Sequence, residues 1–207
     1  MTAKLGVLSA SNAEAIIAGE KTATRQTYMA DLVAQIATGE FPEVSAAALS
    51  WGKENEDSAR AAYEFETGEK IETFSFIFKD DSFRCGISVD GFVLDSKGIE
   101  IKCPYNSKNY IEFLTCDKVK LEWHKQCNFS MWLTGVDRWE FCQFDPRMKK
   151  NPFHRITIQR DEELMKKFYD AVPKFISDMD LMLEKAGFKF GEQWSRLKLT
   201  SKEKTSA

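Results

Sequence analysis

The sequence predicts an α/β fold in which a central mixed β-sheet is flanked by α-helices. Strand-like runs rich in β-branched and aromatic residues occupy the middle of the chain, and longer segments with apolar residues at helical spacing surround them. With 207 residues and 43% hydrophobic content, the chain suits one domain with a sizeable core. We therefore expect a single domain over residues 1–194, followed by a disordered C-terminal tail over residues 195–207.

Local sequence signals predict where the helices and strands lie. A capping-box spacing at Ser11 and Glu14 predicts a short helix near the N-terminus. Further helices are expected at 24–38, 45–67, 106–115, 118–133 and 161–187. Strands are expected at 70–78, 84–89, 92–95, 99–103, 138–144 and 153–158. Glycines directly after several of these helices provide the stop signals.

The stretch 88–104 combines a strand end, a turn and a second strand. Turn residues at 96–98 precede the run 99–103, which Pro104 stops. Because successive side chains of a strand face opposite ways, Glu100 and Lys102 share one face. The other face is apolar and consists of Ile99, Ile101 and Cys103. We expect the apolar face to pack in the core and the charged face to be available for chemistry.

The charged residues of this stretch are suited to metal-dependent cleavage of phosphodiesters. Mg²⁺ prefers carboxylate, carbonyl and water oxygens, so Asp90, Glu100 and the carbonyl of Ile101 would form a partial, open shell. Lys102 could orient or deprotonate a metal-bound water, or neutralise charge on the phosphate. The alternative is a solvated hairpin in which Glu100 and Lys102 form an ordinary surface ion pair.

A further acid is predicted on the helix at 45–67. One stripe of that helix consists of Leu49, Gly52, Glu56, Ala59 and Tyr63. Glu56 carries the one charge on the stripe, and a core-facing carboxylate is unfavourable unless it is paired or binds a metal. The alternative is that Glu56 pairs with Arg60 along the helix surface.

Composition excludes several classes of protein. Five cysteines without a C-x-x-C motif indicate neither a disulfide framework nor a zinc site, and two histidines nearly exclude a His-rich metal site. No stretch approaches the roughly 18 apolar residues of a membrane span. The N-terminus lacks the features of a signal peptide, so a cytoplasmic location is expected. The net charge of −3 does not by itself indicate a nucleic-acid-binding protein.

Seven segments occur in an order that is typical of one nuclease family. They are LGVLSAS (5–11), PEVSAAALSWGKENEDSAR (42–60), SVDG (88–91), GIEIKCP (98–104), FSMWLTG (129–135), DPRMKK (145–150) and FGEQW (190–194). Together they resemble the lambda exonucleases of phage recombination systems, within the YqaJ-type viral exonucleases of the PD-(D/E)xK nuclease superfamily. The resemblance extends from Leu5 to Trp194 and implies a restriction-endonuclease-like fold.

The resemblance implies a Mg²⁺-dependent exonuclease, in which Mn²⁺ can substitute for Mg²⁺. Such an enzyme digests one strand of linear double-stranded DNA in the 5′ to 3′ direction and releases 5′ mononucleotides. The remaining 3′ single strand serves homologous recombination through a phage single-strand annealing protein in the bacterial host. The family also forms a ring-shaped homotrimer around DNA.

By the family's pattern, three groups hold the catalytic metal: Asp90, Glu100 and the carbonyl of Ile101. Glu56 assists a second metal or its water, and Lys102 activates the nucleophile. Gln126 matches a family glutamine near the site.

The resemblance also assigns positions that contact DNA. Ser11 matches a serine that helps to hold the terminal 5′ phosphate, and Lys4 stands where the family has an arginine. A lysine keeps the positive charge but loses the bidentate fork of a guanidinium. Ser88 and Lys108 match phosphate-contacting positions, and Leu49 matches an apolar wedge that splits the terminal base pair.

Two other functions are compatible with the same residues. A PD-(D/E)xK endonuclease or junction resolvase carries the same acidic core, since the superfamily fixes metal chemistry better than substrate. A non-catalytic DNA-binding scaffold is the second alternative, although all four charged positions of the site are retained.

Overall fold

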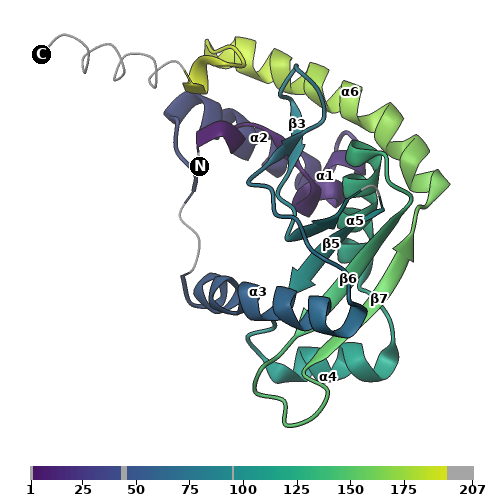
Figure 1. Ribbon diagram of the computed structural model, residues 1–207. Helices are drawn as coiled ribbons and strands as arrows, with labels where there is room; N and C mark the ends of the chain where they lie inside the picture. Colours follow the sequence, from purple (N-terminus) through teal and green to yellow (C-terminus); the bar gives the residue numbers. More distant parts are fainter. Residues whose placement is uncertain (1, 43–45, 95, 195–207) are drawn as a thin grey trace, which may run out of the picture.

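The computed structural model describes residues 2–42, 46–94 and 96–194, and it confirms an α/β fold with helices around mixed sheets (Figure 1). The α-helices are α1 (Ala13–Ile17), α2 (Ala23–Thr38), α3 (Ala46–Thr67), α4 (Ser107–Cys116), α5 (Leu121–Thr134) and α6 (Glu162–Ala186). Short 3₁₀ helices are η1 (Thr2–Lys4), η2 (Ala10–Asn12) and η3 (Glu192–Trp194). The strands are β1 (Leu8–Ser9), β2 (Ile77–Phe78), β3 (Cys85–Ile87), β4 (Gly91–Val93), β5 (Lys97–Lys102), β6 (Arg138–Phe144) and β7 (Phe153–Gln159). The predicted tail at 195–207 lies outside the described residues.

The strands form two sheets instead of the single central sheet that the sequence predicts. The smaller sheet has the order β1-β3-β2, with β1 parallel and β2 antiparallel to β3. The larger sheet has the order β4-β5-β6-β7, in which only β5 and β6 run parallel. The chain passes from the smaller sheet to the larger one between Ile87 and Gly91. Asp90 therefore lies at the junction of the two sheets.

The predicted helices are present, but the predicted capping box at Ser11 and Glu14 is wrong: Ser11 lies within η2, and α1 follows Asn12, whose side chain makes no capping hydrogen bond. Other helix boundaries follow the local signals. The Thr22 side chain accepts a hydrogen bond from the backbone N–H of Arg25 and caps α2. Gly39 and Gly187 adopt left-handed conformations at the ends of α2 and α6, where a residue with a Cβ would be strained.

The predicted strand at 70–78 is largely wrong. Only Ile77–Phe78 pairs along β3, and an isolated bridge joins Glu72 to Phe92. The aromatic rings of this segment pack edge-on against neighbouring rings, for example Phe76 on Phe78 with centroids 4.8 Å apart. This packing replaces the alternation that the sequence pattern indicates.

The predicted turn at 96–98 is also wrong at two of its positions, because Lys97 and Gly98 are the first residues of β5. Lys97 is buried there, and its ammonium lies 2.9 Å from a Glu69 carboxylate oxygen and 3.4 Å from one of Glu140. A buried lysine is tolerated only with such partners. Both partners are distant in sequence, so local pattern could not indicate them.

Hydrophobic residues pack on both faces of the larger sheet. Helix α3 covers one face, where Ala59 and Tyr63 contact Ile99 and Ile101 in a small core cluster. The opposite face belongs to the main core, to which α1, α2, α5 and α6 contribute. In that face Trp123 of α5 stacks on Phe141 of β6, with ring centroids 5.0 Å apart. None of the described helices has the length and apolarity needed to cross a bilayer.

The two ends of the described chain meet. The buried side chain of Gln193, in η3, donates a hydrogen bond from Nε2 to the carbonyl of Leu5 at 3.2 Å. The Gln35 side chain accepts from the backbone N–H of Gly6 at 3.1 Å. These bonds fix the segment that directly follows Lys4.

The close approach of β5 to β6 gives a stability prediction. A Cβ added to Gly98 would lie 2.1 Å from the ring of Trp139, which is fully buried and cannot move aside. We expect Gly98→Ala to reduce the free energy of unfolding by about 1–3 kcal/mol or more, measured by urea denaturation. The matched control is Gly52→Ala in α3, where a Cβ meets no atom within 4 Å. That control should stabilise the protein by roughly 0.5–1 kcal/mol. Equal stability of Gly98→Ala and the wild type would contradict the packing described for β5.

Candidate active site

Strand β5 places its apolar and its charged side chains on opposite faces, as the alternation of its side chains predicts. Ile99 and Ile101 are buried against α3, while Glu100 and Lys102 point to the opposite face, where α5 supplies Gln126. Glu100 is only 4% exposed, so the interpretation of this hairpin as a solvated surface pair is wrong for Glu100. A buried carboxylate needs partners, and these partners define the site.

Asp90 is held against β5 by a backbone hydrogen bond. Its Oδ2 accepts from the N–H of Ile101 at 2.7 Å. Burial raises the pKa of Asp90 to about 7, and the neighbouring Glu100 carboxylate contributes to the increase. The raised pKa of Asp90 thus has two main causes, the loss of solvation on burial and the charge of the Glu100 carboxylate.

Two donors from different elements satisfy one oxygen of Glu100. The ammonium of Lys102 lies 2.5 Å from Oε1, and Nε2 of Gln126 donates to the same oxygen at 2.7 Å. Burial by itself lowers the pKa of Lys102, but Glu100 and then Asp90 more than offset this and raise it above its ordinary value. Gln126 therefore lies near the site, as the resemblance implies, and contacts Glu100.

Glu56 reaches the edge of the site from α3 and pairs with Arg60, one turn later. The same guanidinium group donates from Nη1 to the backbone carbonyl of Asp90 at 2.9 Å. The pairing that the sequence analysis kept as an alternative is therefore present, and it also links Glu56 to Asp90. Arg60 was not identified as a site residue from sequence, because i,i+4 spacing alone does not reveal a contact with a distant carbonyl.

Two cavities meet at Asp90. One, of about 560 Å³, is lined by Asp90, Glu100 and Gln126 together with residues of the N-terminal segment. The other, of about 610 Å³, lies between α3 and the end of β5 and is lined by Glu56, Asp90 and Lys102, among others. Cys103 also lines this cavity, and burial raises the pKa of its thiol to about 12, so it is a neutral thiol at ordinary pH.

Polar groups expected to bind a DNA end line the first cavity. The ammonium of Lys4 donates to the hydroxyl of Ser88 at 2.5 Å and lies 5.1 Å from the centroid of the Phe76 ring. Ser11 exchanges a hydrogen bond with Ser9 at 3.2 Å, and the Asn12 amide donates to both serines. The structure thus brings Lys4, Ser11 and Ser88 together. Ser9 and Asn12 were not identified as site residues from the sequence, although both lie within two residues of Ser11.

Two predicted DNA-binding residues are not part of this arrangement. Lys108 is exposed on α4, pairs with Glu112 at 3.5 Å and is absent from the linings of both cavities. The side chain of Leu49 lies outside the described part of the structure. Both assignments remain predictions.

The donor set fits a hard divalent cation. Within residues 2–42, 46–94 and 96–194, no three His, Cys, Asp or Glu side chains converge as a metal-binding group. Arg60 forms an ion pair with Glu56, and both Lys102 and Gln126 donate hydrogen bonds to Oε1 of Glu100. Oδ1 of Asp90 and Oε2 of Glu100 have no hydrogen-bond partner among the described residues. Two free carboxylate oxygens beside a cavity are ligands that suit Mg²⁺ or Mn²⁺.

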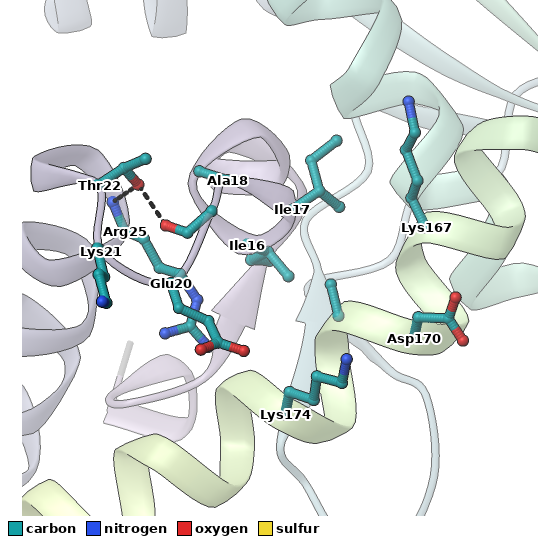
Figure 2. A pocket seen from close by; sticks show the side chains of 12 residues that line it. Ile16, Ile17, Ala18, Glu20, Lys21, Thr22, Arg25, Lys167, Asp170 and Lys174 are labelled. Atoms are coloured by element: carbon teal, nitrogen blue, oxygen red, sulfur yellow. Dashed lines mark hydrogen bonds between the residues drawn. The ribbon is translucent and has the colours of Figure 1, made fainter.

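A further cavity, of about 730 Å³, lies between the turn after α1 and helix α6 (Figure 2). Four cations and two acids line it, and one of the cations, Arg25, is already paired with Asp178 at 2.9 Å. It shares no lining residue with the two cavities beside Asp90. This cavity is therefore not part of the candidate active site, despite its size.

Residues 1–137 match the YqaJ-like viral recombinase domain. The chain belongs to this family. This confirms the resemblance noted from the sequence motifs.

Solved structures and a curated relative agree with this assignment. LHK-Exo in complex with dAMP is 35% identical, with a TM-score of 0.81 over 89% of this chain and 93% of that chain. A second structure of LHK-Exo, an alkaline exonuclease from Laribacter hongkongensis, is 33% identical, with a TM-score of 0.76 over 89% of this chain and 95% of that one. A phage-related exonuclease from Haemophilus somnus 129PT shares the fold, with 14% identity, a TM-score of 0.70 and coverage of 87% and 96% of the two chains. ExoD from Escherichia coli K12 is 44% identical over 78 residues, which are 38% of this chain and 90% of ExoD.

The raised pKa of Asp90 predicts a pH-dependent stability of the metal-free protein. The pKa of Asp90 rises on folding, from 3.8 to about 7, so the folded state binds this proton more tightly than the unfolded state does. Ionisation of Asp90 therefore lowers the stability of the fold. Stability should therefore fall as the pH rises from 4 to 7 and stay low above 7. We expect Asp90→Asn to stabilise the metal-free protein at pH 8, because the variant removes the carboxylate that the fold disfavours in its ionised form. The gain should be smaller at pH 5, as measured by urea denaturation in EDTA. An equal gain at both values would show that the ionisation of Asp90 does not limit stability.

Proposed function

We propose that this protein is a Mg²⁺-dependent exonuclease that digests one strand of linear double-stranded DNA from the 5′ end and releases 5′ mononucleotides. Family membership and likeness to an alkaline exonuclease support a nuclease role. The observation that carries the proposal is the contact of Lys102 with the buried Glu100 beside Asp90, at a cavity that Lys4, Ser11 and Ser88 also line. The dAMP bound in the LHK-Exo structure is a 5′ mononucleotide, which is the product class proposed here.

Asp90 and Glu100 would hold the metal, with the Ile101 carbonyl beside them and Glu56 assisting. When bound, a divalent cation supplies Lewis-acid polarisation of the phosphate and lowers the pKa of a bound water. The protein keeps these ligands in place through the bond from Ile101 N–H to Asp90 and the bond from Gln126 to Glu100.

Lys102 supplies the positive charge that the protein contributes to the proposed reaction. Its ammonium lies next to Glu100 and lines the cavity between α3 and β5. As an ammonium it can neutralise the charge that develops on the phosphate and orient the attacking water. A fixed donor in a site with little water does this without reorganisation at the moment of reaction.

The cavity with Lys4 would hold the 5′ end of the strand that is cut. Lys4 supplies a point charge, while Ser11 and Ser88 supply hydroxyl donors. Ser88 is two residues from Asp90, so a phosphate held at Ser88 lies close to the acidic pair. This proximity supports cutting at the end of a strand.

The ring-shaped homotrimer and the single-strand annealing partner are proposed from the family resemblance. The 3′ single strand left by such an exonuclease is the substrate that an annealing protein requires. We include both in the proposed function on that ground.

The proposal is tested by digestion of matched linear and closed circular duplexes with Mg²⁺ or EDTA. Linear DNA should be converted to mononucleotides only with Mg²⁺, and circular DNA should stay intact. Lys102→Gln, which keeps a hydrogen-bond donor for Glu100, should lower the rate by roughly 10²- to 10⁴-fold while DNA binding persists. Cutting of circular DNA would instead indicate an endonuclease or junction resolvase. Near-normal rates in Lys102→Gln would show that Lys102 is not part of the catalytic group.

The end-binding role of Lys4 gives a second prediction. An ammonium attracts a terminal phosphate, so 5′-phosphorylated ends should be digested faster than 5′-hydroxyl ends, by roughly 10-fold given the strength of hydrogen bonds to charged groups. Lys4→Ala should narrow this ratio, and Lys4→Arg should keep or widen it because the guanidinium restores a bidentate fork. The measurement is single-turnover digestion of the two end types. A ratio that stays the same in Lys4→Ala would place end selection elsewhere, with Lys108 the next residue to test.

A further inference from the structure

Arg147, in the loop after β6, uses its guanidinium group to join three parts of the chain. Nε and Nη2 donate to the two oxygens of the buried Asp145 at 2.7 and 2.9 Å. Nη1 donates to the carbonyl of Tyr105 at 2.9 Å, and Nη2 also donates to the carbonyl of Pro104 at 2.8 Å. The end of β6 is thereby tied to the segment that follows β5.

The third part is the N-terminal half of α3. The guanidinium carbon of Arg147 lies 4.4 Å from the centroid of the Trp51 ring. The ring of Trp51 also packs edge-on against Tyr105, with centroids 6.3 Å apart. The indole Nε1 is buried without a hydrogen-bond partner in the described structure, so Trp51 is held through its ring and not through its N–H group.

Few other polar contacts hold this half of the helix. Over residues 50–57, every side-chain hydrogen bond and ion pair in the described structure stays within α3. The C-terminal half is different, because Ala59 and Tyr63 are buried in the core cluster under β5. Among residues 50–57, the ring of Trp51 thus links α3, through Arg147 and Tyr105, to the segments that follow β6 and β5.

The two segments that Arg147 joins are the two walls of the cavity beside Asp90. Gly52, Lys53 and Glu56 form the α3 wall, and Gly52 directly follows Trp51. The β5 wall includes Lys102 and ends at Pro104, whose carbonyl accepts from Arg147. A shift of the first half of α3 would change the separation of Glu56 from Lys102 and Asp90.

We propose that Arg147 is a positioning residue for the nuclease reaction: it holds the N-terminal half of α3 against the end of β5 and so sets the distance between Glu56 and the group formed by Asp90, Glu100 and Lys102. This inference rests on the proposed function of that site. Lysine cannot replace Arg147, because an ammonium lacks both the fork for Asp145 and the flat face for Trp51.

The first test does not need activity. Hydrogen exchange should be faster in residues 50–57 of Arg147→Lys than in the wild type, while exchange in residues 58–67 stays the same. Lys149→Ala is the matched control, because it removes an exposed cation from the same loop and should leave exchange in α3 unchanged. Unchanged exchange in residues 50–57 of Arg147→Lys would overturn the inference.

The second test distinguishes a positioning role of Arg147 from a role as a charged contact to DNA. Misplacement of a reacting group by about 1 Å lowers rates by roughly 100-fold, so kcat in Arg147→Lys should fall by roughly 10- to 100-fold with little change in KM. Assays should be run well below the unfolding midpoint of each variant. If Arg147 were only a phosphate contact, the lysine would largely restore activity and Arg147→Ala would raise KM. That result would overturn the inference.

Trp51 provides a variant that leaves Asp145 paired. Trp51→Leu should reproduce the loss of kcat, Trp51→Phe should largely restore it, and the double variant of Trp51→Leu with Arg147→Lys should be no worse than either single variant. Additive losses would mean that the two residues act separately and would overturn the inference. If the wild-type protein digests no DNA, the proposed function fails, whereas hydrogen exchange still decides whether Arg147 holds α3.

Discussion

The structure depends on the burial of two carboxylates, Asp90 and Glu100, beside one strand. Burial raises the pKa of Asp90, and repulsion by the like charge of Glu100 raises it further. The surrounding groups reduce the unfavourable energy: a backbone N–H for Asp90, and an ammonium and an amide for Glu100. A site that is strained in this way without a cation is suited to bind one, since a cation relieves the repulsion that the fold maintains. In the proposed function, the pair of residues that would hold the metal is therefore also the pair that makes stability depend on pH.

Much of the fold and the centre of the site could be predicted from sequence because the deciding signals are local. Alternation along β5 correctly separates the apolar Ile99 and Ile101 from Glu100 and Lys102. Helix ends follow from single residues such as Thr22 and Gly39. That Gln126 lies near the site was expected from the family resemblance alone, and its bond to Glu100 was not predicted, because no spacing rule links residues 26 apart.

The features that sequence could not predict depend on contacts between distant residues. From the sequence, Lys97 was expected in a turn. It is instead a buried strand residue, and its ammonium is paired with Glu69 and Glu140. Arg60 bonds to the carbonyl of Asp90, 30 residues away, and no pattern within α3 indicates that bond. The division into two sheets follows from the pairing of β3 with β1, a strand of two residues that is too short to show any period.

The hydrogen bond from Gln193 to Leu5 has a consequence for biosynthesis. It joins residues 188 positions apart, so during synthesis the segment next to Lys4 gains this partner only after the whole intervening chain has been made. Contacts of such long range form late, because the intervening chain must be ordered first. A chain that ends before Gln193 therefore lacks one of the two bonds that fix the segment next to Lys4, a residue of the pocket proposed to seat a DNA end.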